Sequence, residues 1–213
     1  MEGTKKQLEA LRKKCEKAKL GGGQKRIDQQ HERGKLTARE RIELLLDKGS
    51  FHEFGTVATH SLTSFGLDKQ RFMGDGVITG FGKINGRRVA VFPQDFTVMG
   101  GSFSEVQSQK ISRIADRALE VGSPLIGLGD SGGARIQEGV DALSGYGQVF
   151  YNNVLLSGVV PQIAVICGPC AGGAAYSPAL MDFIIMTRNN SYMCLTGPEV
   201  IKAATGQEAP LDQ

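Results

Sequence analysis

The sequence lacks the marks of a membrane, secreted or metal-binding chain. No apolar run reaches the roughly 18 residues of a transmembrane helix, and the charged N-terminus has no apolar signal core. Four cysteines in a chain of 213 residues do not resemble a disulfide scaffold, which favours a reducing compartment. We therefore expect no membrane span, no metal site, and a location in the cytoplasm, or in the mitochondrial matrix of a eukaryote.

Positive charge is concentrated at the N-terminus. Residues 1–41 contain 13 Lys or Arg and six Asp or Glu, which leaves 12 against 16 in the rest of the chain. A basic arm can bind nucleic acid, but this one has no interleaved aromatic residues and no known reader motif, so we expect no nucleic-acid partner. Solvated helix faces, phosphates on a small ligand and acidic patches on a partner chain all remain open explanations.

Residues 1–50 have the pattern of a helical arm that docks or oligomerises. Residues 4–20 carry apolar side chains three and four positions apart, which predicts an amphipathic helix that the glycines at 21–23 end. These side chains are Leu8, Leu11, Cys15 and Ala18. After a polar link, Thr37 can cap a second helix, and Glu40 completes a capping box. The expected buried face of that helix comprises Ile42, Leu44, Leu45 and Leu46.

Residues 51–213 read as one α/β domain. Two β-type runs flank Asn85-Gly86, a strong hairpin signal, and Pro93 ends their pairing. The loop 94–102 (QDFTVMGGS) follows, and Ser104 then caps a helix that extends to about residue 121. Beyond residue 123, short apolar runs alternate with helix-like segments, which predicts α/β layering, a partly parallel sheet and a spiral of repeated steps.

One sequence pattern, an apolar run followed by a glycine-rich turn, occurs twice between residues 124 and 174. An apolar run ends in a glycine-rich turn, once as GDSGGAR (129–135) and once as GPCAGGA (168–174), and each turn leads into a helix-like segment. Those segments are expected at residues 136–156 and 174–181. Such glycines let a ligand approach the backbone, and the free N–H groups at a helix start suit an anion or a developing oxyanion. Two such turns side by side could hold one oxygen between two amide hydrogens.

Three shorter motifs overlap these turns and are set aside. Residues 127–132 match G-x-G-x-x-G, but no acidic residue follows on a next strand at the spacing of a dinucleotide site. Residues 129–133 (GDSGG) match the nucleophile loop of chymotrypsin-like proteases, whose all-β fold contradicts the α/β pattern, so Ser131 is interpreted as a turn residue. Cys167 and Cys170 form a late C-x-x-C without a second pair nearby, and we expect them to be buried as small apolar residues.

Longer motifs carry a specific resemblance. They are GKLTARER (34–41), the loop 94–102, DSGGARIQEG (130–139), LSGYG (143–147), SGVVPQI (157–163), GPCAGGAAYSPA (168–179) and TGPEVI (196–201). Together these segments resemble the carboxyltransferase (β) subunit of biotin-dependent acyl-CoA carboxylases of the propionyl-/methylmalonyl-CoA type. The resemblance covers nearly the whole chain from about residue 22.

The resemblance implies a crotonase-like (ClpP/crotonase) ββα spiral with an N-terminal helical arm, corresponding to the first of two such domains. In that family the first domain binds the acyl-CoA thioester. The second domain of a neighbouring subunit receives carboxybiotin, which is attached to a separate carrier domain. The implied partners are therefore a C-terminal carboxyltransferase domain, a biotin carboxyl carrier or biotin carboxylase subunit, and further copies in an oligomer. The sequence stops where family members continue, so we expect a fragment or one half of a split enzyme.

The resemblance also implies the site residues. By analogy with the crotonase fold, the N–H groups of Ala134 and Gly173 contact the thioester oxygen, with Gly133 and Gly172 as near alternatives. The other expected contacts of the CoA thioester are Gly100, Gly101, Ser102 and Arg135. For Arg135, a pairing with Glu138 is an equal alternative to a ligand contact.

Other functions stay open beside a carboxyltransferase. Arg39 and Arg41 could meet CoA phosphates, but structural ion pairs are favoured. Tyr176 and Glu199 occupy the places of the two hydratase glutamates of the crotonase fold, which disfavours hydratase chemistry. A decarboxylase α subunit of a sodium-pumping complex would share the same local chemistry, and a non-catalytic acyl-CoA-binding or assembly module is the third possibility.

Overall fold

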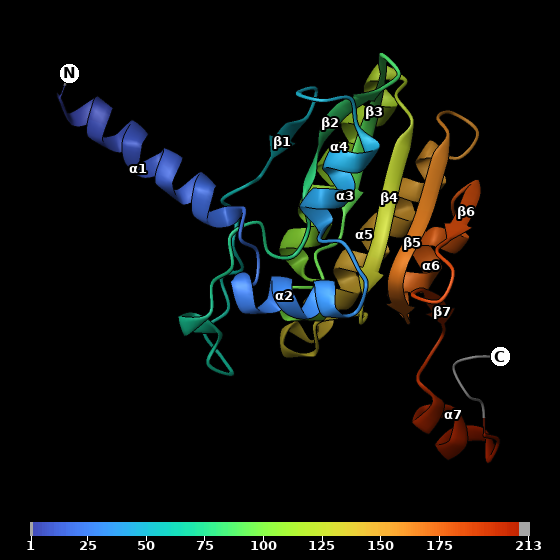
Figure 1. Ribbon diagram of the computed structural model, residues 1–213. Coiled ribbons are helices and arrows are strands. Elements are labelled where there is room, and N and C mark those ends of the chain that lie inside the picture. The colour runs from blue at the N-terminus through green and yellow to red at the C-terminus, as the bar shows by residue number, and fades with distance from the viewer. Residues whose placement is uncertain (1, 209–213) are drawn as a thin grey trace.

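A mixed seven-stranded sheet forms the centre of the computed structural model, which describes residues 2–208. The strand order is β1-β2-β3-β4-β5-β6, and β7 also pairs with β5. The pairings β1–β2 and β2–β3 are antiparallel, and the others are parallel (Figure 1). The strands are β1 (His52–Phe54), β2 (Thr79–Ile84), β3 (Arg87–Pro93), β4 (Leu125–Ser131), β5 (Gln162–Ala171), β6 (Phe183–Met186) and β7 (Tyr192–Cys194).

The predicted hairpin is confirmed at β2 and β3, but Pro93 does not end its pairing, because the Pro93 carbonyl accepts the Ile78 N–H at 3.0 Å and Val77 pairs with Gln94. Asn85 and Gly86 have φ of 50° and 79°, as a tight two-residue hairpin turn requires. The Asp47 carboxylate accepts both of their N–H groups, at 2.9 and 2.8 Å. The chain can therefore reverse within two residues, and the antiparallel ribbon leads directly into the parallel part of the sheet.

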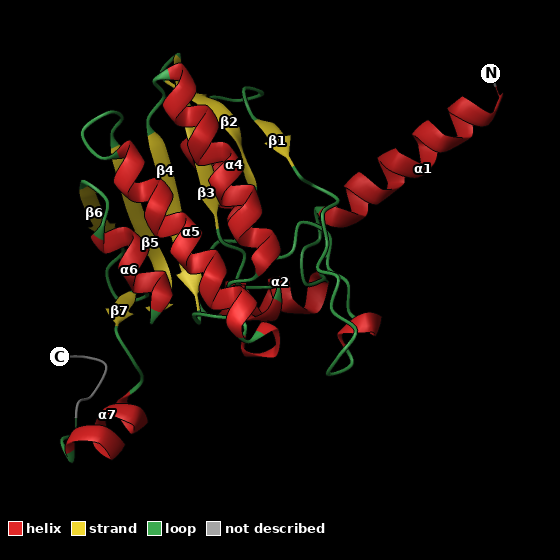
Figure 2. Ribbon diagram, turned by 180° about the vertical axis from the view of Figure 1, so that it is seen from behind, coloured by secondary structure: helices red, strands yellow, loops and turns green. Residues whose placement is uncertain are grey.

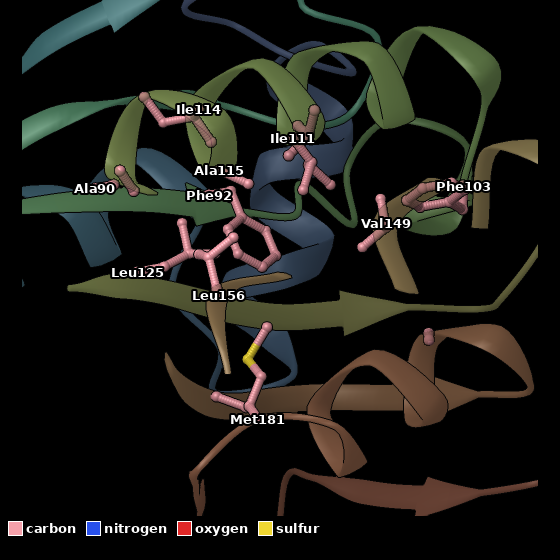
Figure 3. Close-up of a cluster of buried hydrophobic side chains, with 14 of the residues drawn as sticks. Ala90, Phe92, Phe103, Ile111, Ile114, Ala115, Leu125, Val149, Leu156 and Met181 are labelled. Atoms are coloured by element: carbon pink, nitrogen blue, oxygen red, sulfur yellow. The ribbon is translucent and has the colours of Figure 1, made fainter. Parts of the chain in front are cut away.

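Helices α4 (Glu105–Val121), α5 (Val140–Leu156) and α6 (Gly173–Ala179) cover one face of the sheet (Figure 2). The expected cap is present, because Ser104 Oγ accepts the Gln107 N–H at 3.0 Å. Apolar side chains of these helices interlock with those of β3, β4 and β5 in the main core (Figure 3). That core includes Phe92, Phe103, Ile111, Leu125, Tyr146, Val149, Leu156 and Ile166.

Helix α3 (Ala38–Leu45) packs on the opposite face of the sheet. Its capping box is present as predicted, with Thr37 Oγ1 accepting the Glu40 N–H and the Glu40 carboxylate accepting the Thr37 N–H. Ile42 and Leu46 lie in a second apolar cluster with strand residues. The predicted burial of Leu44 is wrong, because its side chain is 78% exposed on the outer side of the helix.

The N-terminal segment contains two further helices. Helix α1 (Glu2–Ala18) projects away from the sheet (Figures 1 and 2), and Leu8 and Leu11 remain about half exposed on it. It joins the body at Gly22, whose N–H donates to Thr97 Oγ1 at 3.0 Å and where a Cβ would collide with the Thr97 carbonyl. Helix α2 (Gln24–Glu32) replaces the polar link that the sequence suggested.

The remaining elements are short. Helix α7 (Pro198–Thr205) lies apart from the sheet (Figure 1). Three 3-10 turns interrupt the loops: η1 (Leu67–Lys69), η2 (Met99–Gly101) and η3 (Ile136–Glu138). No helix within residues 2–208 combines the length and apolar character needed to cross a bilayer.

Candidate functional site

The first glycine turn follows β4 and is held by Phe103. The Phe103 N–H donates to the Gly133 carbonyl, and the Arg135 N–H donates to the Phe103 carbonyl, both at 2.8 Å. Gly133 has φ of 97°, and a Cβ there would lie 2.8 Å from the Ala171 carbonyl oxygen. Glycine is therefore required both by the backbone angle and by the close approach of the second turn.

The expected helix start at residue 136 is wrong. A 3-10 turn occupies Ile136–Glu138, and α5 begins only at Val140. The N-cap of α5 is Gly139, whose φ and ψ of 57° and −125° nearly equal those of Gly172 before α6. Because residues 133–135 are bound to Phe103 instead, the Ala134 amide has no helix dipole behind it.

The second turn is present but shorter than expected, because the strand continues through residues 168–171 and the helix spans residues 173–179 instead of 174–181. β5 ends at Ala171, Gly172 is the N-cap, and α6 begins at Gly173. The Gly172 carbonyl accepts the Ala175 N–H at 2.9 Å, which fixes the plane of the peptide between residues 172 and 173. The Gly173 N–H is therefore one of the amides that a helix start leaves unpaired.

The two turns lie side by side, and their amides differ in availability. Ser131 on β4 pairs with Cys170 on β5, so both turns leave the same edge of the sheet. The Gly133 N–H donates to Ser131 Oγ at 3.2 Å, and the Gly172 N–H donates to the Cys194 carbonyl at 2.9 Å. Within residues 2–208, the amides of Ala134 and Gly173 have no hydrogen-bond acceptor.

Peptide geometry gives the direction of the Ala134 amide. A trans peptide directs its N–H opposite to the preceding carbonyl. Because the Gly133 carbonyl accepts the Phe103 N–H, the Ala134 N–H points away from Phe103. Gly133 and Gly172, the two alternative donors, already use their N–H groups inside the protein.

The loop containing Gly100, Gly101 and Ser102 lies against the first turn. The Gly132 N–H donates to the Gly100 carbonyl at 3.0 Å, and Ser131 Oγ donates to the Gly101 carbonyl at 2.7 Å. Gly101 approaches so closely that a Cβ would be 2.2 Å from the Asp130 carbonyl oxygen. These contacts hold the loop against the first turn, and Gln107 Nε2 also donates to the Ser102 carbonyl at 2.8 Å.

The expected ligand contact of Arg135 is not compatible with its position. The side chain is fully buried, and Nη1 donates to Asp75 at 2.8 Å and to Glu138 at 3.0 Å. Nε and Nη2 face Ser102, at 3.3 Å each. The alternative pairing with Glu138 is therefore confirmed, and Arg135 braces the loop and the turn from inside the protein.

Asp130 is the other ionic centre of the site, and the sequence did not indicate it. Its carboxylate is completely buried and accepts Lys35 Nζ at 2.7 Å, Arg41 Nη2 at 2.7 Å and Gln30 Nε2 at 3.0 Å. Arg39 instead forms a two-point ion pair with Glu53. The favoured interpretation of Arg39 and Arg41 as structural ion pairs is confirmed.

The cysteines beside the second turn behave as apolar residues. Burial raises the pKa of the Cys170 thiol to about 12 and also raises that of Cys167. Neither thiol is therefore a ready thiolate. The expected burial is confirmed for Cys170, whereas Cys167 is only partly buried. Among residues 2–208 no cluster of three or more His, Cys, Asp or Glu is arranged to hold a metal ion.

An internal cavity of about 30 Å³ lies behind the turns, lined by Phe103, Tyr146 and Ala174 among others. This volume is close to that of about one water molecule. The cavity is therefore too small for a ligand much larger than water.

A sheet covered by α4, α5 and α6 on one face and by α3 on the other, with two adjacent glycine turns at the ends of parallel strands, is the crotonase-like carboxyltransferase fold. The chain belongs to the carboxyl transferase domain family, whose pattern it matches over residues 29–212.

Several relatives are similar over nearly the whole chain. The propionyl-CoA carboxylase beta chain of Roseobacter denitrificans is 60% identical over 97% of this chain and 40% of its own length. The methylmalonyl-CoA decarboxylase subunit alpha of Propionigenium modestum is 55% identical over 98% of this chain and 40% of its own length. The chain thus spans about 40% of the length of these relatives.

Solved structures agree with these sequence matches. The transcarboxylase 12S hexamer core, with methylmalonyl-coenzyme A and methylmalonic acid bound, superimposes with a TM-score of 0.92 at 55% identity, covering 96% of this chain and 40% of that one. The geranyl-CoA carboxylase beta subunit of P. aeruginosa has a TM-score of 0.71 at 29% identity, covering 99% of this chain and 37% of that one.

Proposed function

We propose that this chain is the acyl-CoA-binding half of a biotin-dependent carboxyltransferase that acts on a short-chain acyl-CoA of the propionyl-/methylmalonyl-CoA type. Family membership and 60% identity to a propionyl-CoA carboxylase beta chain support this proposal. The match to transcarboxylase 12S with methylmalonyl-coenzyme A bound supports the substrate class.

The reaction requires an enolate to be held away from water. Carboxybiotin, when bound, would supply the CO2 and, once decarboxylated, the base that takes the α-proton of the acyl group. This chain would contribute the two amides of Ala134 and Gly173, which stabilise the negative thioester oxygen. Losing one such donor typically costs about 3–4 kcal/mol of transition-state stabilisation.

The observation that carries this assignment is the pair of unused amides. Both preceding carbonyls are engaged inside the protein, so each peptide plane is fixed before a ligand arrives. Fixed donors cost no reorganisation during the reaction, which is the reason backbone amides are effective at such sites. The amides of Gly133 and Gly172 are less suited because their hydrogens are already donated.

Calorimetric titration of propionyl-CoA into the folded, oligomerised chain tests binding, with free coenzyme A as the matched ligand. Saturable binding that depends on the acyl group is expected. An absence of binding in a sample with native circular dichroism would contradict the proposal.

Substitution of Ala134 by proline tests the donor itself. Ala134→Pro removes the N–H and costs no internal hydrogen bond, because that N–H has no acceptor within the described chain. Transfer in an enzyme reconstituted with a C-terminal carboxyltransferase domain should fall by about 10²–10³. Ala134→Ser keeps the N–H and is the matched control, and equal rates for the two variants would refute the role.

Two alternatives lead to different measurements. The 55% identity to a methylmalonyl-CoA decarboxylase subunit alpha favours a decarboxylase as the second candidate, and the gene neighbours of this chain would separate the two. A non-catalytic acyl-CoA-binding or assembly module would bind the ligand but give no transfer after a C-terminal half is added. Restored transfer would exclude that module.

We further propose that the chain works in a homo-oligomer, with a C-terminal carboxyltransferase domain and a biotin carrier or biotin carboxylase subunit as partners. Relatives of this chain include the transcarboxylase 12S hexamer core. Large apolar side chains are exposed on η3, α5 and β6, which supports a covered surface in the assembly. They include Ile136, Val140, Leu143, Val154, Phe183 and Ile185. The location in cytoplasm or mitochondrial matrix stays a prediction.

A further inference from the structure

Two stacked aromatic rings, those of Phe103 and Tyr146, lie on the core side of the two glycine turns, and each is attached to or in contact with one of them. We propose that Phe103 and Tyr146 are positioning residues that set the separation of the Ala134 and Gly173 amides. This inference rests on the proposed function, because it assigns a task to the rings only if those two amides act together on one oxygen.

The first end of the stack is attached to the first turn. Phe103 is buried, and its backbone makes both hydrogen bonds of the bridge to Ala134, at 2.8 Å each. A displacement of the Phe103 backbone therefore displaces the peptide that carries the Ala134 amide. The Phe103 ring extends from this bridge into the main core (Figure 3).

The two rings are in close parallel contact. The centroids of Phe103 and Tyr146 are 3.9 Å apart and the ring planes differ by 16°. Gly145 allows this contact, because a Cβ there would lie 2.9 Å from Ser108 Cβ and 3.3 Å from the Phe103 ring. Helix α5 can thus approach α4 closely enough to place Tyr146 directly on Phe103.

The other end of the stack lies against the second turn. A Cβ on Gly173 would be 2.7 Å from Cδ2 and Cε2 of Tyr146, so the ring is in contact with the backbone that carries the Gly173 amide. Phe150 extends the stack beyond Tyr146, with centroids 5.8 Å apart. The rings are therefore a rigid spacer on the core side of the two turns, which also approach each other directly at Gly133 and Ala171, within a core that resists compression.

The hydroxyl of Tyr146 is not part of this spacer. Its oxygen is buried and has no hydrogen-bond partner within residues 2–208. Burial raises the pKa of this hydroxyl well above its ordinary value, so it stays protonated. Tyr146→Leu removes the aromatic ring and with it the stacking contact. Tyr146→Phe keeps the ring and removes only the hydroxyl, so it is the matched control.

Infrared spectroscopy of bound propionyl-CoA, labelled with 13C at the thioester carbonyl, measures the donors directly. Two donated hydrogen bonds lower the carbonyl stretching frequency relative to free ligand. Wild type and Tyr146→Phe should show the full downshift, and Tyr146→Leu should lose most of it while still binding propionyl-CoA. A purely structural role of the ring would change stability and leave the downshift intact.

Gly173→Ala provides a second route that leaves the core side chains in place. The added methyl collides with the Tyr146 ring and should also reduce the downshift, and the double variant Gly173→Ala/Tyr146→Leu should recover part of it. A full downshift in folded Tyr146→Leu would overturn the positioning role and leave the proposed function standing. If Tyr146→Leu does not fold, a full downshift in Gly173→Ala would have the same consequence. No downshift in wild type with bound ligand would overturn the function proposed for the two amides and the spacer with it.

Discussion

Replacing Asp130 by asparagine removes the negative charge at the centre of the buried ionic cluster. The substituted side chain would keep nearly the same volume, but Lys35 and Arg41 would lose the carboxylate that each contacts at 2.7 Å and would remain almost fully buried. Breaking a buried ion pair by removing one partner costs about 3–5 kcal/mol, because an uncompensated charge stays in the interior. For a chain of this size, that loss corresponds to a Tm lower by about 6–20 °C.

Urea unfolding followed by circular dichroism measures this loss, with Glu120→Gln as the control. Glu120 pairs with Arg117 on the surface, where both side chains are more than half exposed, so its charge should contribute less than about 1 kcal/mol. The midpoint for Asp130→Asn should fall with little change in slope. If the two variants unfold at the same urea concentration, Asp130 does not hold α2 and α3 to the sheet in the way described.

Three further outcomes are expected. Ile42→Ala should lower the free energy of unfolding by about 2–5 kcal/mol, and Leu44→Ala by less than about 0.5 kcal/mol, because only the Ile42 side chain is buried. Similar losses for the two variants in chemical denaturation would contradict the packing of α3. Burial lowers the pKa of Lys110 to about 8, so between that pH and about 10.5 the folded state binds fewer protons than the unfolded state. Relative to Lys110→Met, the free energy of unfolding of wild type should therefore rise from about pH 8 to about pH 10.5. Parallel pH profiles of the two proteins would exclude this effect. Serine at both Leu8 and Leu11 should lower the mass measured by light scattering at an unchanged Tm if α1 joins subunits, whereas an unchanged mass would show that α1 does not.

Elements with local chemical signals were predictable from the sequence. The Asn85-Gly86 turn and the caps at Thr37 and Ser104 each depend on a few neighbouring residues, and all are confirmed. The two glycine turns were also located, since glycines follow apolar runs in both places. The assignment of Ala134 and Gly173 as donors stays a prediction that the free amides support.

Features that depend on distant contacts were not predictable. Helix α2 has no apolar periodicity, and its buried residue Gln30 faces Asp130, which is 100 positions away. The start of α5 lies later than the sequence predicts because a 3-10 turn occupies residues 136–138 and Gly139, with φ of 57°, separates it from the helix. Arg135 looked available to a ligand because its partner Asp75 lies 60 positions away.

A bulge in β5 lies just before the two glycine turns and beside the buried ionic cluster of Asp130. Gly129 is opposite Ile166, whereas Ser131 is opposite Cys170, so β5 contains two extra residues at this point. Gly168 lies in that bulge, directly against the Asp130 carboxylate, where a Cβ would be 2.0 Å from Oδ1. The last pair of the ladder, Ser131 with Cys170, lies just before the two glycine turns. The bulge and the buried ionic cluster beside it therefore set the register in which the two strands reach their glycine turns.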